Sequence, residues 1–401
     1  MRRIYQAVIE NHFDSCKQML FLAGPRQVGK STISLVAENL TDNFTYLNWD
    51  EASDRDLILQ GSKIVADKIN LNRVYIKKPL LVFDEIHKYL KWKNYLKGFY
   101  DYYKDKVNII VTGSAKLDIY RKGADSLMGR YFLYRIHPFS VAECINTALP
   151  NQEIQKPKQI DNNLFEVLWE FGGFPEPFLK KNKLFYQRWK NLRIKQLFRE
   201  DIRDLTQIQE LGQIEVFARF LKQQPGQLMS LSNLAQKTQV SVNTVKRWLN
   251  TLESFYYCFL IRPWAKRIAR SLLKEPKLYL YDWSQVDDPG ARAENFVASH
   301  LLKAVHFWTD YGFGDFQLYF LRDKEKREVD FLVTKNGKPW FLVEVKISDT
   351  HLSKSLEVFQ KQTGAMHAFQ VVFNMEYVDT DCFQYKTPIV VPVKTFLSQL
   401  I

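Results

Sequence analysis

Cysteine is scarce in this chain, and long apolar runs are absent. The 401 residues include four cysteines, which are widely scattered and lack CxxC spacing. A disulfide framework and a zinc site are therefore not expected, and a reducing cytoplasmic location fits. No segment approaches about 18 consecutive apolar residues, so we expect no transmembrane helix and no membrane association. The first residues carry two arginines but no apolar core of a signal peptide, and they predict an amphipathic helix.

Acidic residues are too few to balance the basic ones. The chain has 57 lysines and arginines against 44 aspartates and glutamates, which gives a formal net charge of +13. Such an excess favours a polyanionic partner, nucleic acid first, because contacts of Lys and Arg with phosphate supply most non-specific affinity. The alternative is a basic protein without such a partner. The composition is otherwise that of a soluble globular protein, and 401 residues predict two or three domains.

The order of apolar runs predicts an α/β architecture in several domains. Over residues 1–150 short apolar runs alternate with amphipathic stretches, as in a parallel sheet with helices between its strands. The polar residues 146–163 predict a linker, and residues 151–210 as a whole predict a helical linker or lid region. Residues 211–270 predict a compact helical unit followed by a strand, and residues 275–401 return to α/β character. The strands expected in the first domain are Gln18–Ala23, Phe44–Asn48, Leu80–Phe83 and Val107–Thr112.

A phosphate-binding loop follows the first apolar run. The segment Gly24–Ser31 fits the pattern GxxxxGK[ST] at every fixed position and opens a helix. The glycines let successive backbone N–H groups turn toward phosphate, Lys30 would reach the β- and γ-phosphates of ATP, and the Ser31 hydroxyl would ligate Mg²⁺. We expect the nucleotide to contact Gly24, Pro25, Arg26, Gln27, Val28, Gly29, Lys30, Ser31 and Thr32.

Two carboxylates follow the apolar run that begins at Leu80. Asp84, at the end of this strand, would hold the magnesium shell opposite Ser31. Glu85 would orient and deprotonate the water that attacks the γ-phosphate, a role that requires a carboxylate near that phosphate. The sequence thus predicts ATP and Mg²⁺ as cofactors and ATP hydrolysis as the activity.

Residues after the fourth apolar run are candidates for sensing the γ-phosphate. Thr112 or Ser114 could do so from the end of this strand. Arg130 is the candidate for an arginine finger, which would stabilise the charge of the transition state. Arg121 and Arg135 compete for that role, and each of the three could instead be an ordinary ion-pair donor.

Together these segments resemble the AAA-type ATPases of bacteria and archaea, in which the ATPase is fused to a poorly characterised C-terminal domain. The resemblance implies the AAA+ fold and a homo-oligomer, with a hexameric ring favoured, because such ATPases complete their sites in trans. It does not imply one physiological role, since members of this family are functionally diverse. The segments that carry the similarity are Gly24–Ser31, Asp84–Lys88, Thr112–Ser114, Gly129–Arg130, Pro138–Ser140, Gly172–Glu176 and Pro276–Asp282.

Residues 231–252 have the pattern of a helix-turn-helix. Ser241 is placed to cap the second helix. The side chains expected on the core face of that helix are Val242, Val245, Leu249 and Leu252. Asn243, Lys246 and Arg247 lie elsewhere on the helix and would face DNA in a winged helix, with residues 256–261 as the strand that follows. A structural or protein-contacting winged helix is the alternative.

Two basic stripes occur near this unit. A solvated helix face usually carries both signs of charge, whereas acidic residues are missing from most of each stripe, and this favours DNA. The first stripe consists of Lys183, Arg188, Lys190, Arg193, Lys195, Arg199 and Arg203, and the second of Arg262, Lys266, Arg267, Arg270 and Lys274.

Residues 291–374 predict a helix, a three-stranded meander, a helix and a strand. Period-two alternation puts Glu344 and Lys346 on one face of the third strand, with Asp330 on its neighbour. Asp330, Glu344 and the preceding Glu294 would hold Mg²⁺, and Lys346 would polarise the attacking water or the phosphate. This set resembles the PD-(D/E)XK nuclease superfamily, with Val329 in place of its proline. Many nuclease-like domains only bind DNA, so both binding and cleavage stay open.

Two functional hypotheses result. The first is an ATP-hydrolysing protein that acts on duplex or branched DNA, with a nuclease-like domain that binds and, in the stronger form, cleaves it. The alternative is a nucleotide-gated regulatory or defence effector that works through a protein partner. Stimulation of ATP hydrolysis by DNA is expected only under the first hypothesis.

Overall fold

The computed structural model describes residues 1–113, 127–203, 210–265 and 275–401. Its contacts divide the chain into two compact units. The first unit is Met1–His137 with Thr147–Leu149, and the second is Pro138–Asn146 with Pro150–Ile401. Residues 138–146, which the sequence placed in the first domain, thus belong by their contacts to the second unit.

A five-stranded parallel sheet forms the centre of the first unit. Its order is β2-β3-β4-β1-β5. The strands are β1 (Met19–Ala23), β2 (Phe44–Asn48), β3 (Leu80–Asp84), β4 (Asn108–Gly113) and β5 (Tyr131–Arg135). The first four agree with the predicted apolar runs to within one residue at each end. Strand β5 was not predicted, although residues 131–134 form an apolar run, and this edge strand is only partly buried.

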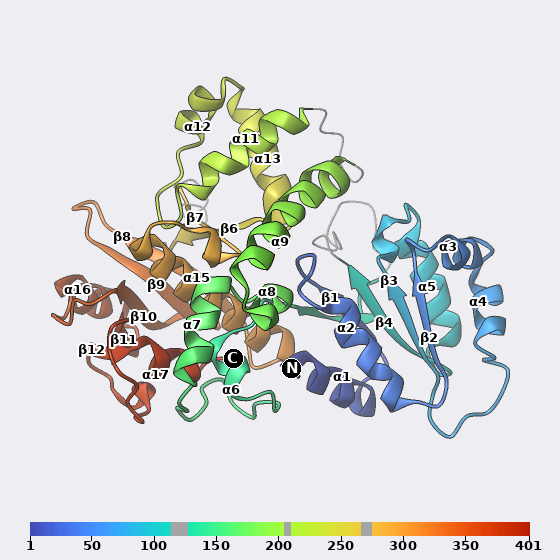
Figure 1. The fold of residues 1–401 in the computed structure, drawn as a ribbon. Coiled ribbons are helices and arrows are strands. Elements are labelled where there is room, and N and C mark those ends of the chain that lie inside the picture. Colours follow the sequence, from blue (N-terminus) through green and yellow to red (C-terminus); the bar gives the residue numbers. More distant parts are fainter. Residues whose placement is uncertain (114–126, 204–209, 266–274) are drawn as a thin grey trace. The chain divides into compact units, whose positions relative to one another are not determined.

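Helices cover both faces of this sheet. In Figure 1, α1 (Ile4–Ser15) and α2 (Lys30–Leu35) lie on one side, and α4 (Ser62–Lys68) and α5 (Trp92–Tyr103) lie on the other. Alternate strand residues such as Phe21 and Phe83 pack with Leu96 and Phe99 of α5 in one apolar cluster. The remaining helices are α3 (Ala52–Leu59) and the 3-10 turns η1 (Val36–Leu40) and η2 (Ile86–Lys88).

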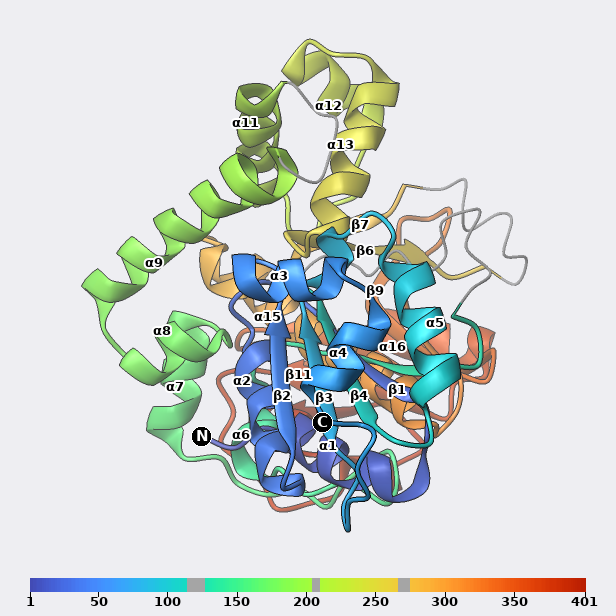
Figure 2. The same cartoon turned by 90° about the vertical axis from the view of Figure 1, so that its right-hand side faces the viewer.

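The second unit begins with helices. These helices are α6 (Val141–Ile145), α7 (Asn162–Phe171), α8 (Pro175–Lys180), α9 (Lys183–Gln196), the π-helical turn η3 (Leu197–Ile202), α11 (Leu211–Lys222), α12 (Leu231–Thr238) and α13 (Val242–Ser254). Figure 2 shows the long α9 leading toward the group formed by α11, α12 and α13. Among the described residues, no helix combines the length and apolar character needed to cross a membrane.

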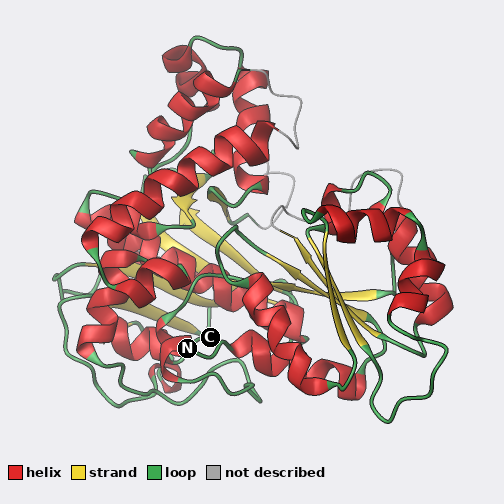
Figure 3. Ribbon diagram, turned by 45° about the vertical axis from the view of Figure 1, so that its right-hand side comes forward, coloured by secondary structure: helices red, strands yellow, loops and turns green. Residues whose placement is uncertain are grey.

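A seven-stranded sheet follows, in the order β12-β11-β10-β9-β8-β6-β7, with helices beside it (Figure 3). The strands are β6 (Cys258–Pro263), β7 (Lys277–Leu280), β8 (Phe316–Arg322), β9 (Glu328–Lys335), β10 (Lys338–Lys346), β11 (His367–Val372) and β12 (Ile389–Pro392). The helices are η4 (Trp283–Gln285), α15 (Pro289–Tyr311), α16 (Lys354–Thr363), η5 (Cys382–Gln384) and α17 (Val393–Ser398). The predicted succession of helix, three-stranded meander, helix and strand is confirmed by α15 to β11.

The sheet crosses a predicted domain boundary. Strands β6 and β7 lie on either side of residues 270–275 and pair antiparallel, while β6 also pairs with β8. The strand predicted as a wing and the strands predicted as nuclease-like therefore belong to one sheet.

Buried polar contacts hold Pro138, Glu143 and Glu153 within the second unit. The Lys303 side chain is 2% exposed, and its ammonium donates to the carbonyl oxygen of Pro138 at 3.1 Å and to the Glu143 carboxylate. The Trp308 indole N–H donates to the Glu153 carbonyl oxygen at 3.0 Å. The polar stretch predicted as a linker is therefore packed against its own unit.

The buried His300 makes folding of the second unit sensitive to acid. The Val141 N–H donates to Nε2 of His300 at 3.0 Å, and Nδ1 donates to the Phe296 carbonyl oxygen at 2.7 Å. Because Nε2 accepts a hydrogen bond, the ring is neutral. Burial lowers the pKa of His300 from 6.5 to about 3. The unfolded chain therefore binds more protons between these pH values, and stability falls as the pH drops below about 6.5.

We predict that His300→Gln flattens this acid dependence. In the wild type, the unfolding free energy should fall by about 2 kcal/mol between pH 7 and pH 5, because His300 is protonated in the unfolded chain alone. Urea denaturation at both pH values measures the difference. The matched control is His351→Gln, because that imidazole is 98% exposed. Equal pH slopes for wild type and His300→Gln would contradict the assignment.

Candidate functional site

The loop between β1 and α2 is shaped by glycine at its tightest points. A Cβ on Gly24 would lie 2.4 Å from the carbonyl oxygen of Ile136, so no side chain fits there. Gly29 has φ 95°, in the left-handed region, and immediately precedes α2. The predicted P-loop therefore has the turn that its sequence pattern requires.

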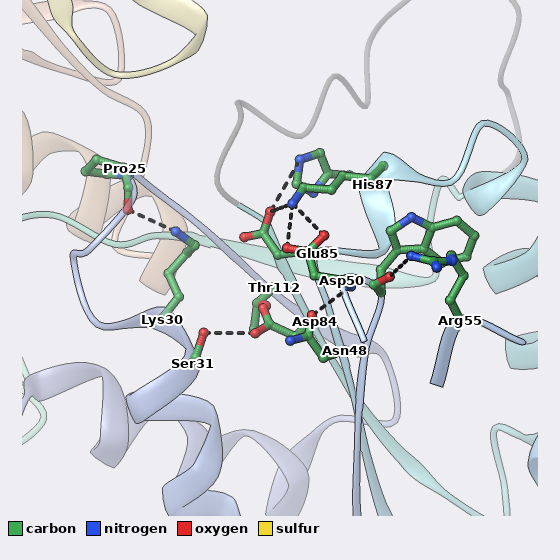
Figure 4. Close-up of polar contacts among 12 residues, drawn as sticks. Pro25, Lys30, Ser31, Asn48, Asp50, Arg55, Asp84, Glu85, His87 and Thr112 are labelled. Atoms are coloured by element: carbon green, nitrogen blue, oxygen red, sulfur yellow. Dashed lines mark hydrogen bonds and ion pairs between the residues drawn. The ribbon is translucent and has the colours of Figure 1, made fainter. Parts of the chain in front are cut away.

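Lys30 lies inside this loop. The residue is 5% exposed, and its ammonium donates to the carbonyl oxygens of Gly24 and Pro25, each at 2.9 Å. Figure 4 shows the side chain turned toward Pro25. The loop thus holds a buried positive charge where phosphate oxygens would replace the two carbonyl groups.

Asp84 is the centre of the polar contacts beside the loop. Its carboxylate accepts a hydrogen bond from the Ser31 hydroxyl at 2.9 Å, and also from the hydroxyls of Tyr46 and Thr112. The parallel register pairs Asp84 directly with Thr112 of β4. The structure therefore brings together the predicted residues Ser31, Asp84 and Thr112, while Ser114 and Arg121 lie outside the described residues (Figure 4).

Tyr46 was not predicted. It reaches Asp84 from the adjacent strand β2, and burial together with Asp84 raises the pKa of its phenol above the ordinary value. Its phenol therefore stays protonated and available as a hydrogen-bond donor. No sequence pattern pointed to Tyr46, because a tyrosine in a strand is more often a packing residue.

Glu85 leaves the strand in an unusual conformation. Its φ of 54° is left-handed, and its N–H donates to the Thr112 carbonyl oxygen at 3.1 Å. Its Oε2 lies 3.7 Å from Nε2 of His87 and 3.8 Å from the Lys88 ammonium. Burial lowers the pKa of His87, so this imidazole is neutral at neutral pH. Glu85 is thus held next to Asp84 but turned away from the contacts of Asp84 (Figure 4).

The residues around Asp84 fit a magnesium-nucleotide complex. The Ser31 hydroxyl and the Asp84 carboxylate are hard oxygen donors, which Mg²⁺ prefers. They lie 2.9 Å apart and beside the P-loop that carries the Lys30 ammonium. Ser31 and Asp84 are therefore the residues that would hold the ion.

Arg130 lies far from this P-loop. Its carbonyl oxygen accepts from the N–H of Met19, the first residue of β1, whereas the loop follows the last residue of β1. Its guanidinium forms two hydrogen bonds with the Asp101 carboxylate, at 2.7 and 2.9 Å. Arg130 therefore does not serve the site of its own chain, and a role in the site of another copy stays a prediction.

Arg3 contacts the P-loop and was not predicted. It is 4% exposed, and its guanidinium donates to the carbonyl oxygens of Val28 at 2.9 Å and His137 at 2.6 Å. One side chain from the start of the chain thus fixes the loop to residue 137. Two successive arginines at the N-terminus predicted only an amphipathic helix, and nothing in that pattern distinguishes Arg3 from Arg2.

The predicted nuclease-like residues come close to one another in the second unit. Lys346 pairs with Oε1 of Glu344 at 2.9 Å, and the Val345 N–H donates to Oδ2 of Asp330 at 2.9 Å. The pKa of Glu294 and that of Glu344 are both raised to about 7. Burial is the main cause, and the charge of Asp330 is the second.

An unpredicted lysine lies in the same cluster. The Lys277 ammonium is 3.0 Å from Glu294 and 3.5 Å from Asp330. Within the described ranges, no three His, Cys, Asp or Glu side chains are arranged to hold a metal ion. An ammonium thus lies against Glu294 and Asp330, two of the three residues predicted to hold Mg²⁺, and the role of these residues as ligands stays a prediction.

Among the residues of the predicted helix-turn-helix, the three polar ones are exposed, while the predicted burial of Val242 is wrong. Asn243, Lys246 and Arg247 are exposed on α13, and Ser241 caps this helix by accepting from the Thr244 N–H. Val242, expected in the core, is 45% exposed because it is the first helical residue and lies beyond the end of the apolar cluster. Trp248, with no exposed surface, fills the core instead.

The first basic stripe is only partly a surface. Arg193 points inward, where its guanidinium lies 3.8 Å from the ring centre of Phe174 and 3.5 Å from Asp282. Arg188, Lys195 and Arg199 are exposed, and their spacing puts them along one side of α9 and η3. Most of the second stripe, Lys266 to Lys274, lies outside the described residues.

Known families match three stretches of the chain. Residues 16–145 match a family described as an AAA domain. Residues 162–286 and 289–396 match two domains of unknown function, DUF8612 and DUF4143. The AAA match covers the part of the chain that contains the P-loop, and the geometry of this loop agrees with that match.

Relatives along most of the chain are uncharacterized proteins. Rv2008c of Mycobacterium tuberculosis is 21% identical over 353 residues, which cover 84% of this chain and 72% of that protein. MJ1544 of Methanocaldococcus jannaschii is 23% identical over 354 residues, which cover 84% and 77%.

Two solved structures are similar to the chain at low TM-scores. The Aeropyrum pernix ORC1 protein in complex with DNA has 13% identity and a TM-score of 0.32, over 70% of this chain and 88% of that one. AMPPCP-bound DnaA from Aquifex aeolicus has 15% identity and a TM-score of 0.31, over 62% and 85%. TM-scores at this level carry no argument about function.

We predict that Arg3→Met destabilises the first unit and weakens nucleotide binding. The change removes two charge-assisted hydrogen bonds to buried carbonyl groups, which should cost about 2–4 kcal/mol of unfolding free energy. Denaturant unfolding and titration with a fluorescent ATP analogue measure the two effects. Arg2→Met is the matched control, because the Arg2 side chain is 55% exposed and pairs with Glu10 at the surface. Equal behaviour of the two variants would contradict the role of Arg3.

Proposed function

We propose that this chain hydrolyses ATP with Mg²⁺ at the site around Asp84 and uses the cycle to act on DNA. The observation that carries the first part is the hydrogen bond between Ser31 and Asp84, which joins the P-loop to the acidic strand end. Both predicted magnesium ligands are thereby in one place, with Lys30 and Glu85 on either side.

Each residue of the site has a distinct task. The Lys30 ammonium exchanges the carbonyl oxygens of Gly24 and Pro25 for phosphate oxygens and neutralises their charge. Ser31 and Asp84 hold Mg²⁺, which when bound stabilises negative charge on the phosphates. Glu85 takes the proton of the attacking water. Thr112 and Tyr46 orient the Asp84 carboxylate through their hydroxyl groups.

We predict that Glu85→Gln and Lys30→Ala separate catalysis from binding. Glu85→Gln should lower the rate of ATP hydrolysis by about 10²–10⁴-fold and still bind ATP, because the amide cannot accept the proton. Lys30→Ala should lose ATP binding as well. Steady-state phosphate release and nucleotide titration give the two quantities, with the exposed Glu38→Gln as control. Hydrolysis retained by Lys30→Ala would refute the assignment of the site.

Charge supports DNA as the substrate of the cycle. The chain has a net charge of +13, and three exposed basic residues, Arg188, Lys195 and Arg199, follow one side of α9 and η3. Asn243, Lys246 and Arg247 are exposed on α13, as the reading helix of a winged helix would require. In this proposal the second unit binds DNA, and copies of the chain assemble into a ring in which Arg130 serves a neighbouring site.

We predict that replacing Arg188, Lys195 and Arg199 with glutamine weakens DNA binding. If each residue contacts a phosphate, the slope of log affinity against log salt should fall by about 3. Fluorescence anisotropy with duplex, single-stranded and four-way-junction DNA provides the measurement. The control variant replaces Lys63, Lys68 and Lys77 with glutamine, three exposed residues of the first unit. It loses the same amount of charge, and its slope should stay unchanged. No binding by the wild type at low salt would end the DNA proposal.

A second candidate function rests on the apolar part of the same helix. Leu184 and Leu192 of α9 are 74% and 52% exposed, and their spacing puts them on the side that carries Arg188. Exposed leucines contribute little to phosphate contacts but are common at protein interfaces. This observation favours a nucleotide-gated regulatory or defence effector with a protein partner. Two results together would support this second function. ATP hydrolysis does not respond to any DNA, and a protein partner is recovered with the wild type but not with Leu184→Ser/Leu192→Ser.

A further inference from the structure

Lys277 is a deeply buried charge of the nuclease-like region. It is the first residue of β7, and its side chain is 2% exposed. Its ammonium lies 2.6 Å from Glu328, 3.0 Å from Glu294 and 3.5 Å from Asp330. One cation on β7 thus faces three carboxylates, one from α15 and two from β9.

Most carboxylate oxygens of this cluster are already engaged by the chain itself. Oε1 of Glu294 also accepts from the Tyr279 hydroxyl at 2.6 Å, and Oδ2 of Asp330 accepts from the Val345 N–H at 2.9 Å. Oε2 of Glu328 pairs with Arg322 at 2.6 Å. In the described part of the chain, Oε2 of Glu344 is buried without a hydrogen-bond partner. A single such oxygen falls short of the several oxygen ligands that Mg²⁺ needs in near-octahedral geometry.

The backbone around Lys277 closes the cluster. Gly226 has φ +76°, and a Cβ on it would lie 2.9 Å from Oε2 of Glu294, so the loop passes directly over this carboxylate. The N–H groups of Gly226 and Met229 donate to the carbonyl oxygens of Leu278 at 2.9 Å and Pro276 at 2.8 Å. Residues 226–229 therefore fix the edge of β7 that carries Lys277.

The charges of the cluster come close to balance without a metal ion. The Lys277 ammonium lies 2.6 to 3.5 Å from three carboxylates of the cluster. With Arg322 and Lys346 it gives three positive charges against the four carboxylates Glu294, Glu328, Asp330 and Glu344. A divalent cation would add excess positive charge at short range from an ammonium.

We propose that the Lys277 ammonium takes the place of the divalent cation that a PD-(D/E)XK-type site would need. The acidic cluster is then a metal-independent tie between β7, α15 and β9. The second unit retains the residues of the motif but does not cleave phosphodiester bonds.

Manganese binding to the full-length chain without nucleotide tests this proposal. Free Mn²⁺ is followed by electron paramagnetic resonance for the wild type, Asp330→Asn, Lys277→Met and Lys277→Met/Asp330→Asn. The P-loop site is the same in all four proteins, so its contribution cancels. Lys324→Met, in an exposed turn between β8 and β9, is the control for loss of one positive charge.

We expect the wild type and Asp330→Asn to bind the same amount of Mn²⁺. Lys277→Met should bind Mn²⁺ about tenfold more tightly or better, because the repelling ammonium is gone, and Mn²⁺ should raise its Tm. The double variant and Lys324→Met should not show this gain. ATP hydrolysis by Lys277→Met reports on the first unit separately, so a failure here is distinct from a failure of the proposed function.

Two results would overturn the proposal. One is Mn²⁺ binding by the wild type that is lost in Asp330→Asn. The other is Mn²⁺-dependent DNA cleavage by the wild type that is lost in the same variant. Both comparisons use the wild type and Asp330→Asn alone, so they hold even if Lys277→Met does not fold.

Discussion

A charge that is buried in a protein has to be paired, and this constraint governs both units of the chain. Asp84 is 5% exposed and is stabilised by three hydroxyl groups. Lys303 is paired with Glu143, and removal of one partner of such a pair typically costs about 3–5 kcal/mol. Each buried charge therefore fixes the elements around it. The ATP site, the entry of the chain into the second unit and the acidic cluster are each built around one of these ions.

The parts that the sequence predicted are those with a local signal. A P-loop is a run of eight residues, and β1 to β4 are continuous apolar segments, so both can be recognised without knowledge of the fold. Asp84 and Thr112 follow from the rule that parallel strands end at the same edge of a sheet. Edge strand β5 also contains an apolar run, residues 131–134, but this run was not assigned to a strand from the sequence.

The residues that the sequence missed act through partners far away in the chain. Arg3 binds the carbonyl oxygens of Val28 and His137, and backbone acceptors leave no trace in a side-chain pattern. Lys277 stands in the strand sequence Lys-Leu-Tyr-Leu, where a lysine at the first position suggests an exposed end. Arg193 was counted in a basic stripe although it packs on Phe174. In each case the three-dimensional partner, and not the residue type, decides the role.

The tie made by Lys277 also constrains how chains of this kind diverge. Its partners Glu294 and Asp330 stand 17 and 53 residues away in the sequence. Loss of the ammonium alone leaves carboxylates that repel one another, and loss of a carboxylate alone leaves a cation without enough counter-charge. Substitutions at these positions are therefore coupled, so homologous sequences should change at 277 together with 294, 328 or 330. A strand edge, a helix and a hairpin strand thus form one evolutionary unit.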